Sequence, residues 1–161
     1  MIEIYQQEHC DFYDITAGVL EAILAQKTVR AGSITIPKNA FNPLRHQYDA
    51  VTIINHISTI KSGSKTMKLG IVNRDLYSRG MNFIFGLADP LCNTALISTY
   101  RLNGENMHER IAKEVVHEVG HLLGLSHCSD TSCVMCFSNT VEDTDRKEQT
   151  LCSACRSKLE S

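Results

Sequence analysis

The sequence has no hydrophobic run that approaches the roughly 18 apolar residues needed to cross a membrane. It also has no large excess of charge of one sign, because 16 basic and 18 acidic residues leave a net charge of -2. This balance offers no electrostatic reason to expect a nucleic acid or an anionic membrane surface as a partner. Residues 1–14 lack the basic flank and apolar stretch of a signal peptide, so we expect a cytoplasmic protein.

Prolines are also scarce, at three, and no internal repeat or low-complexity tract divides the chain. A length of 161 residues predicts a single domain spanning residues 1–161, and we expect a monomer. The composition, 43% hydrophobic and 21% charged, is typical of a globular protein that buries enough apolar surface to fold without disulfides.

Cysteine is the residue type whose distribution is uneven. The sequence contains seven cysteines, and five of them lie in its last 34 residues. In a cytoplasmic protein free thiols persist, and clustered cysteines are more often metal ligands than disulfides. The C-terminal part of the chain is therefore a candidate metal-binding segment.

Hydrophobic patterning predicts an α+β fold, with a mixed twisted sheet and backing helices over residues 1–105. A helix is expected over 14–26, with Asp14 as its N-cap, and a second over 48–61. The segment 38–50 is expected to be a polar loop. Short strands are predicted over 2–6, 33–37, 67–73, 81–87 and 94–102.

The clearest predicted element is a helix within residues 106–125. Asn106 and Glu109 resemble a capping box, and an apolar stripe follows them to about Leu123. Gly124 stands where a helix ends in a left-handed residue. Over 126–161 the regular patterning disappears, which predicts an irregular segment that needs something besides a hydrophobic core to order it.

The stretch HEVGHLLGLSH, which starts in this helix and ends just after it, indicates a catalytic metal site. His117 and His121 are four residues apart, so both imidazoles project from one face and can meet one cation. Glu118 is displaced from them around the helix, where its carboxylate can serve as a general base. The turn at Gly124 brings in His127 as a third ligand, and three histidines leave the fourth zinc position open, as in catalytic sites.

The string H-E-x-x-H-x-x-G-x-x-H resembles the metzincin zinc peptidases, and Met135 is the counterpart of the methionine in their characteristic turn. Cys128, Cys133 and the C-x-x-C pair at 152–155 make the chain similar to one branch, the archaemetzincins. The diagnostic match covers residues 117–155, and a weaker likeness extends upstream.

This resemblance implies a cytoplasmic zinc metallopeptidase that hydrolyses peptide bonds in a peptide or protein substrate, using a zinc-activated water and Glu118 as general base. It implies two zinc ions per chain. The catalytic zinc would be held by His117, His121 and His127, and the structural zinc by Cys128, Cys133, Cys152 and Cys155. The family also pairs its substrate with an edge strand, for which the candidate residues are Asn82, Phe83, Ile84 and Phe85.

Cys136 leaves the cysteine assignment open. With Cys133 it forms a second C-x-x-C, so Cys136 competes with Cys128 for a place beside Cys133 and the pair at 152–155. We favour Cys128, because a knuckle around 133–136 would bend the chain where Met135 must turn toward the other metal.

A second function is also compatible with the sequence: a zinc-stabilised module that binds proteins or peptides and does not cleave them. The full histidine set with Glu118 favours the peptidase. Arg146 and Lys147 are expected to be solvated loop charges, and Cys10 and Cys92 to be isolated thiols.

Overall fold

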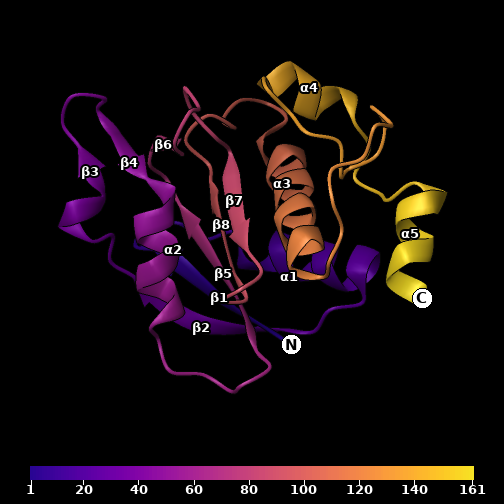
Figure 1. Ribbon diagram of the computed structural model, residues 1–161, viewed down its shortest axis with the longest axis horizontal. Coiled ribbons are helices and arrows are strands. Elements are labelled where there is room, and N and C mark those ends of the chain that lie inside the picture. The colour runs from indigo at the N-terminus through magenta and orange to yellow at the C-terminus, as the bar shows by residue number, and fades with distance from the viewer.

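A five-stranded sheet lies at the centre of the structure, a computed structural model that describes residues 1–161 (Figure 1). Its strand order is β2-β1-β5-β8-β7. The first four strands are parallel, and β7 pairs antiparallel with β8 at the edge. The strands are β1 (Ile2–Gln7), β2 (Thr28–Ile34), β5 (Met67–Val72), β7 (Gly86–Asp89) and β8 (Thr94–Ser98).

Helices cover both faces of this sheet (Figure 1). On one face, α1 (Tyr13–Leu24) and α3 (Met107–Leu122) enclose the larger hydrophobic cluster. On the other face, α2 (Ala50–Ser58) encloses a smaller one. Side chains alternate between the faces along β5: Leu69 and Ile71 enter the first cluster, and Val72 enters the second. The α+β fold class predicted from the sequence is confirmed.

The predicted loop over 38–50 is instead part of a small second sheet. A short 3₁₀ helix, η1 (Lys38–Ala40), leads into it, and its three strands run in the order β3-β4-β6. These strands are β3 (Phe41–Asn42), β4 (Gln47–Asp49) and β6 (Leu76–Tyr77). The N-terminus of α2 is capped by Asp49, whose side chain accepts a hydrogen bond from Val51 N.

One predicted helix cap is wrong and a second lacks its predicted hydrogen bonds, although both helices form. Asp14 lies inside α1, and no side chain caps that helix. Asn106 does precede α3, but its side chain makes no capping hydrogen bond. Glu109 lies 3.0 Å from Lys113 Nζ in an i,i+4 ion pair, and this partner replaces the backbone in the predicted capping box.

The edge strand starts later than predicted, at Gly86 in place of residue 81. Residues 82–85 are irregular apart from one isolated bridge between Ile84 and Leu76. Here side chains donate to backbone carbonyls that strand pairing would otherwise use. Arg45 donates to Met81 O at 2.7 Å, and Gln47 donates to Asn82 O at 2.8 Å. The strand predicted over 33–37 is likewise displaced, and ends at Ile34.

The segment after residue 125 is more regular than predicted. It contains α4 (Val141–Arg146) and α5 (Ser153–Glu160); in Figure 1, α4 lies above α3 and α5 lies to its right. A capping box formed by Thr140 and Asp143 begins α4, a local signal that the apolar pattern does not carry. No helix in the structure has the length and apolar character needed to cross a membrane.

Gly70 determines how closely α2 can approach the sheet. A methyl group at this position would lie 2.5 Å from Ile57 Cδ1 and 3.1 Å from Leu96 Cδ1. We therefore expect Gly70→Ala to lower the free energy of unfolding by about 1–3 kcal/mol, measured by urea denaturation. Gly18→Ala is the matched control, because a methyl group on that exposed face of α1 meets nothing within 4 Å. Equal stability of the two variants would contradict the close contact.

Candidate metal centres

Three histidines converge at the end of α3. His117 and His121 project from one face of the helix, and the chain then turns at Gly124, whose φ is +95° as predicted. This turn brings His127 beside them, so that one nitrogen from each ring lies within 4.8 Å of the others. The Nε2 atoms of His117 and His121 are 3.2 Å apart. Tetrahedral zinc, with Zn–N bonds near 2.0–2.1 Å, places its ligand nitrogens about 3.3 Å apart.

Backbone carbonyls orient two of these rings. Nδ1 of His117 lies 2.8 Å from Val134 O, and Nδ1 of His121 lies 2.8 Å from Leu125 O. Because a carbonyl only accepts, each Nδ1 must carry the proton and donate, which leaves each Nε2 lone pair free for a cation. These lone pairs belong to the two Nε2 atoms that lie 3.2 Å apart.

The environment also keeps the rings neutral. Burial, followed by the charge of Lys147, lowers the pKa of His117 to about 3. Burial is also the main cause that lowers the pKa of His121 and of the more exposed His127. A neutral imidazole is the form that binds a metal, so the donor set fits zinc.

Glu118 lies beside the histidines in a cleft of about 710 Å³. The side chain is buried, and its pKa is raised first by that burial and second by the nearby charge of Glu114. A raised carboxyl pKa brings the group closer to the range in which it exchanges protons at neutral pH. The cleft therefore contains a candidate metal site and a candidate base together.

The rest of the cleft wall is largely apolar. Phe83, Ile84 and Phe85 line it, whereas Asn82 does not, so the structure places three of the four predicted edge residues at the cleft. Phe137 lies against His127 with ring centroids 5.2 Å apart. Met135 is fully buried beneath α3, with its sulfur against Gly120.

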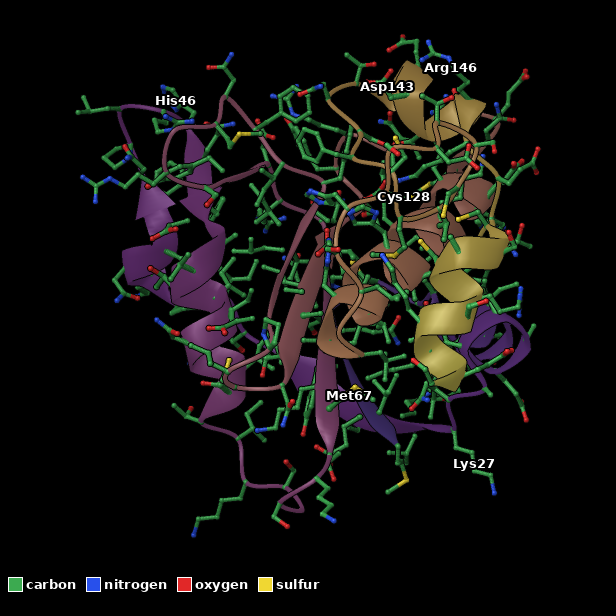
Figure 2. All side chains as sticks on the ribbon, turned by 45° about the vertical axis from the view of Figure 1, so that its right-hand side comes forward. Lys27, His46, Met67, Cys128, Asp143 and Arg146 are labelled. Carbon is green, nitrogen blue, oxygen red and sulfur yellow. The ribbon has the colours of Figure 1, made fainter.

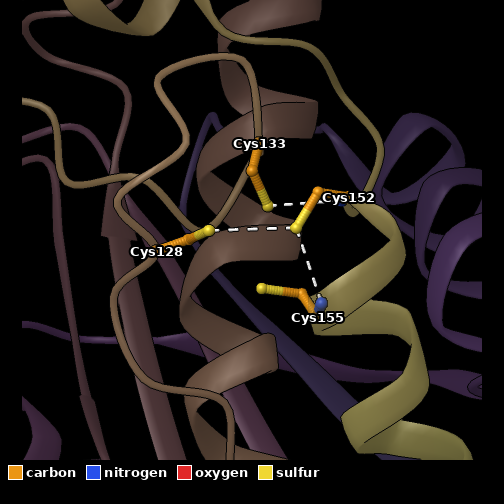
Figure 3. Close-up of side chains that lie close together, drawn as sticks. All are labelled: Cys128, Cys133, Cys152 and Cys155. Atoms are coloured by element: carbon orange, nitrogen blue, oxygen red, sulfur yellow. Dashed lines mark hydrogen bonds between the residues drawn. The ribbon is translucent and has the colours of Figure 1, made fainter.

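Four cysteines form a second group (Figure 3). Its members are Cys128, Cys133, Cys152 and Cys155. The sulfurs of Cys128 and Cys152 are 3.8 Å apart, far beyond a disulfide bond and close to the roughly 3.8 Å between thiolates on tetrahedral zinc. Cys136 is outside the group, and its thiol lies near Phe137 O. Of the two cysteine sets that the sequence left open, the structure brings together the one that includes Cys128.

Backbone N–H groups point at these sulfurs. Cys155 N donates to Cys152 Sγ at 3.5 Å, and this contact is the main cause that lowers the pKa of Cys152 to about 7. Cys152 N donates in turn to Cys133 Sγ at 3.4 Å. N–H donors stabilise thiolates, the form that binds metal, whereas burial raises the pKa of Cys133 and of Cys155. The group fits zinc because four sulfurs converge on one point.

Comparison with known proteins decides the family. The model of peptidase family M54 matches residues 6–161. The chain belongs to this family. A curated archaemetzincin from Archaeoglobus fulgidus is 38% identical over 149 residues, which cover 91% of this chain and 89% of that protein. Family membership makes the protein a zinc metallopeptidase, a hydrolase, as the sequence predicted.

Solved structures of similar proteins share the whole fold. The crystal structure of an archaemetzincin from Methanopyrus kandleri has a TM-score of 0.91 and 29% identity, covering 99% of this chain and 92% of that one. The crystal structure of a zinc-dependent peptidase from Methanocorpusculum labreanum has a TM-score of 0.88 and 26% identity, covering 99% and 100%. The correspondence extends through the cysteine-rich end of this M54 chain.

The prediction that Lys147 is a solvated charge is wrong. Its side chain is 1% exposed; its Nζ donates to Cys136 O at 3.0 Å and lies 3.6 Å from a carboxylate oxygen of Glu114. Arg146 does face solvent and pairs with Asp143, and both are seen at the outer surface of α4 in Figure 2. Helical spacing could have placed Glu114 on the face of Glu118, but no local pattern marks Lys147 as buried.

Removing Lys147 should destabilise this M54 protein strongly, because it leaves the buried carboxylate of Glu114 unpaired. We expect Lys147→Met to lower the free energy of unfolding by about 3–5 kcal/mol in urea denaturation of the zinc-loaded protein. The double variant Glu114→Gln/Lys147→Met removes both charges and should lose less than Lys147→Met alone.

Arg30→Met is the control for this prediction, because the Arg30–Asp11 pair is largely exposed, at 50% and 70%. It should have no measurable effect on unfolding, since exposed ion pairs contribute little. A Lys147→Met variant as mild as Arg30→Met would contradict the role of the buried pair.

Proposed function

We propose that this protein hydrolyses peptide bonds, with one zinc ion at His117, His121 and His127 and with Glu118 as general base. The observation that carries the proposal is the pair of Nε2 atoms 3.2 Å apart, in the same cleft as a buried carboxylate of raised pKa. We further propose a second, structural zinc at Cys128, Cys133, Cys152 and Cys155, which gives two zinc ions per chain.

Zinc held by His117, His121 and His127 would supply Lewis-acid chemistry, which polarises a scissile carbonyl and acidifies an attacking water. Glu118 accepts the proton of that water and then delivers it to the nitrogen of the leaving amine. The side chains of the apolar cleft wall restrict the access of bulk water to the carboxylate, and thereby strengthen its interactions. No serine or cysteine nucleophile is required.

The edge of the sheet suggests how a peptide is held. Strand β7 pairs only with β8, so the backbone groups of its other edge are free to pair with an extended chain. Phe83, Ile84 and Phe85 precede this strand and line the cleft, where they would contact the substrate. If the protein held a peptide in this way but did not cleave it, it would be a peptide-binding module.

Glu118→Gln tests the role of the base. The variant should keep both zinc ions, because a glutamine side chain has nearly the same shape as a glutamate, and should lose at least about 100-fold in kcat because the amide cannot accept the proton. Hydrolysis is measured on a quenched-fluorescence peptide library, and metal content by elemental analysis.

Glu109→Gln on the same helix is the matched control, because the Glu109 side chain is 60% exposed, and this variant should be fully active. Undiminished turnover by Glu118→Gln would exclude the proposed mechanism. A wild-type protein that binds peptides but cleaves none would favour the binding module.

Metal analysis tests the two-zinc proposal and the choice between Cys128 and Cys136. We expect two zinc ions in the wild-type protein, of which mild chelation removes the one at the partly exposed histidines first. Cys128→Ser should lose the tightly bound zinc, and Cys136→Ser should retain it. The reverse pattern would show that Cys136 is the fourth ligand, and a single zinc per chain would contradict the second site.

A further inference from the structure

Gly86, the first residue of the edge strand β7, lies directly against the proposed base. A methyl group at this position would lie 2.8 Å from Cγ and 3.0 Å from Oε1 of Glu118. It would also lie 2.7 Å from Leu96 O of the neighbouring strand. No side chain fits between the strand and the helix here, so the absence of one allows β7 to approach α3 this closely.

The carboxylate of Glu118 has little else in the protein to hold it. No side-chain hydrogen bond or ion pair from the protein reaches it, although the side chain is only 6% exposed. Two charges act on it from nearby: Glu114 on the same helix face raises its pKa, and Lys147 lowers it without reaching it by a hydrogen bond. Glu114 already accepts a hydrogen bond from Thr144 Oγ1 at 3.2 Å. Packing therefore restricts the position of the Glu118 carboxylate, and in the edge strand Gly86 is a residue whose added methyl group would meet it.

We propose that Gly86 is a positioning residue for Glu118: its missing side chain seats the carboxylate between the edge strand and the histidines. The inference rests on the proposed function of Glu118 as general base. Proton transfer requires a heavy-atom distance near 2.6–3.2 Å, so a shift of about 1 Å in the base is enough to reduce the rate by two orders of magnitude. A methyl group at position 86 would impose a shift of that size.

The position of Gly86 relates the base to the substrate as well. The strand that begins at Gly86 has the open edge with which an extended peptide would pair. The same residue therefore fixes the distance between the helix that carries the carboxylate and the strand that would carry the peptide. A larger residue at position 86 would move the Glu118 carboxylate and the bound peptide away from the attacking water.

The first test is a double-mutant cycle on activity, with the peptide library as substrate. Gly86→Ala should lower kcat by about 100-fold and change KM by less than about 3-fold, with zinc content unchanged. The variant Glu118→Asp has a carboxylate one methylene shorter, which makes room for the methyl group. In that background Gly86→Ala should cost less than about 10-fold, and an equal loss in both backgrounds would overturn the proposal.

The second test does not depend on hydrolysis. Gly86→Ala should lower the Tm of the zinc-loaded protein by about 3–10 °C, because the added methyl overpacks the contact. In a Glu118→Ala background the decrease in Tm caused by Gly86→Ala should be measurably smaller. The decrease that remains would come from the contact of the methyl group with Leu96 O. Gly70→Ala is the control, since its methyl meets Ile57 on the opposite face of the sheet, and its shift should be the same with and without Glu118.

The two tests separate the possible failures. Additive Tm shifts for Gly86→Ala and Glu118→Ala would show that the two residues are not in contact, and would overturn the positioning role even in an active enzyme. An inactive wild-type protein with coupled Tm shifts would instead contradict the proposed function while supporting the contact.

Discussion

The hydrogen bond between His117 Nδ1 and Val134 O, 2.8 Å long, connects the two parts of the molecule on which the site depends. His117 belongs to α3, which packs on the sheet through the larger hydrophobic cluster. Val134 belongs to the irregular chain after α3, between Cys133 and Met135. One carbonyl thus selects the tautomer of a candidate zinc ligand and ties the cysteine-rich segment to the core.

That segment is held at several further points. Cys128 N donates to Met135 O at 3.0 Å, and Val134 N donates to Thr150 O at 3.1 Å. His127 and Cys128 are adjacent in the chain but belong to different candidate metal groups. Because Cys133 is in the cysteine group and its neighbour Val134 orients His117, the two groups cannot move independently. We therefore expect disorder in the cysteine group to disturb the histidines as well.

Local chemistry explains why much of the site could be predicted from the sequence. Spacing of four residues on a helix brings His117 and His121 together whatever the rest of the fold does, and the turn at Gly124 follows from one residue. The cysteines were harder, because both competing sets have zinc-like spacing and only the folded path of the chain separates them. The buried position of Lys147 and the irregular path of residues 82–85 depend on partners far away in the sequence: Glu114 for the first, and Arg45 with Gln47 for the second.

The neighbouring buried charges explain how the fold accommodates Glu118, the proposed base, which accepts no hydrogen bond from any donor of the protein. Burial of a carboxylate without a hydrogen-bond partner is unfavourable, and Glu118 is in this situation next to a second acid, Glu114. Lys147 offsets the second acid, and its Nζ also holds Cys136 O beside the buried Met135. The lysine that offsets Glu114 thus also contacts the turn beneath the histidines. A lysine 25 residues or more from α3 in the sequence therefore supports the site from behind the cleft, through Glu114 and Cys136 O.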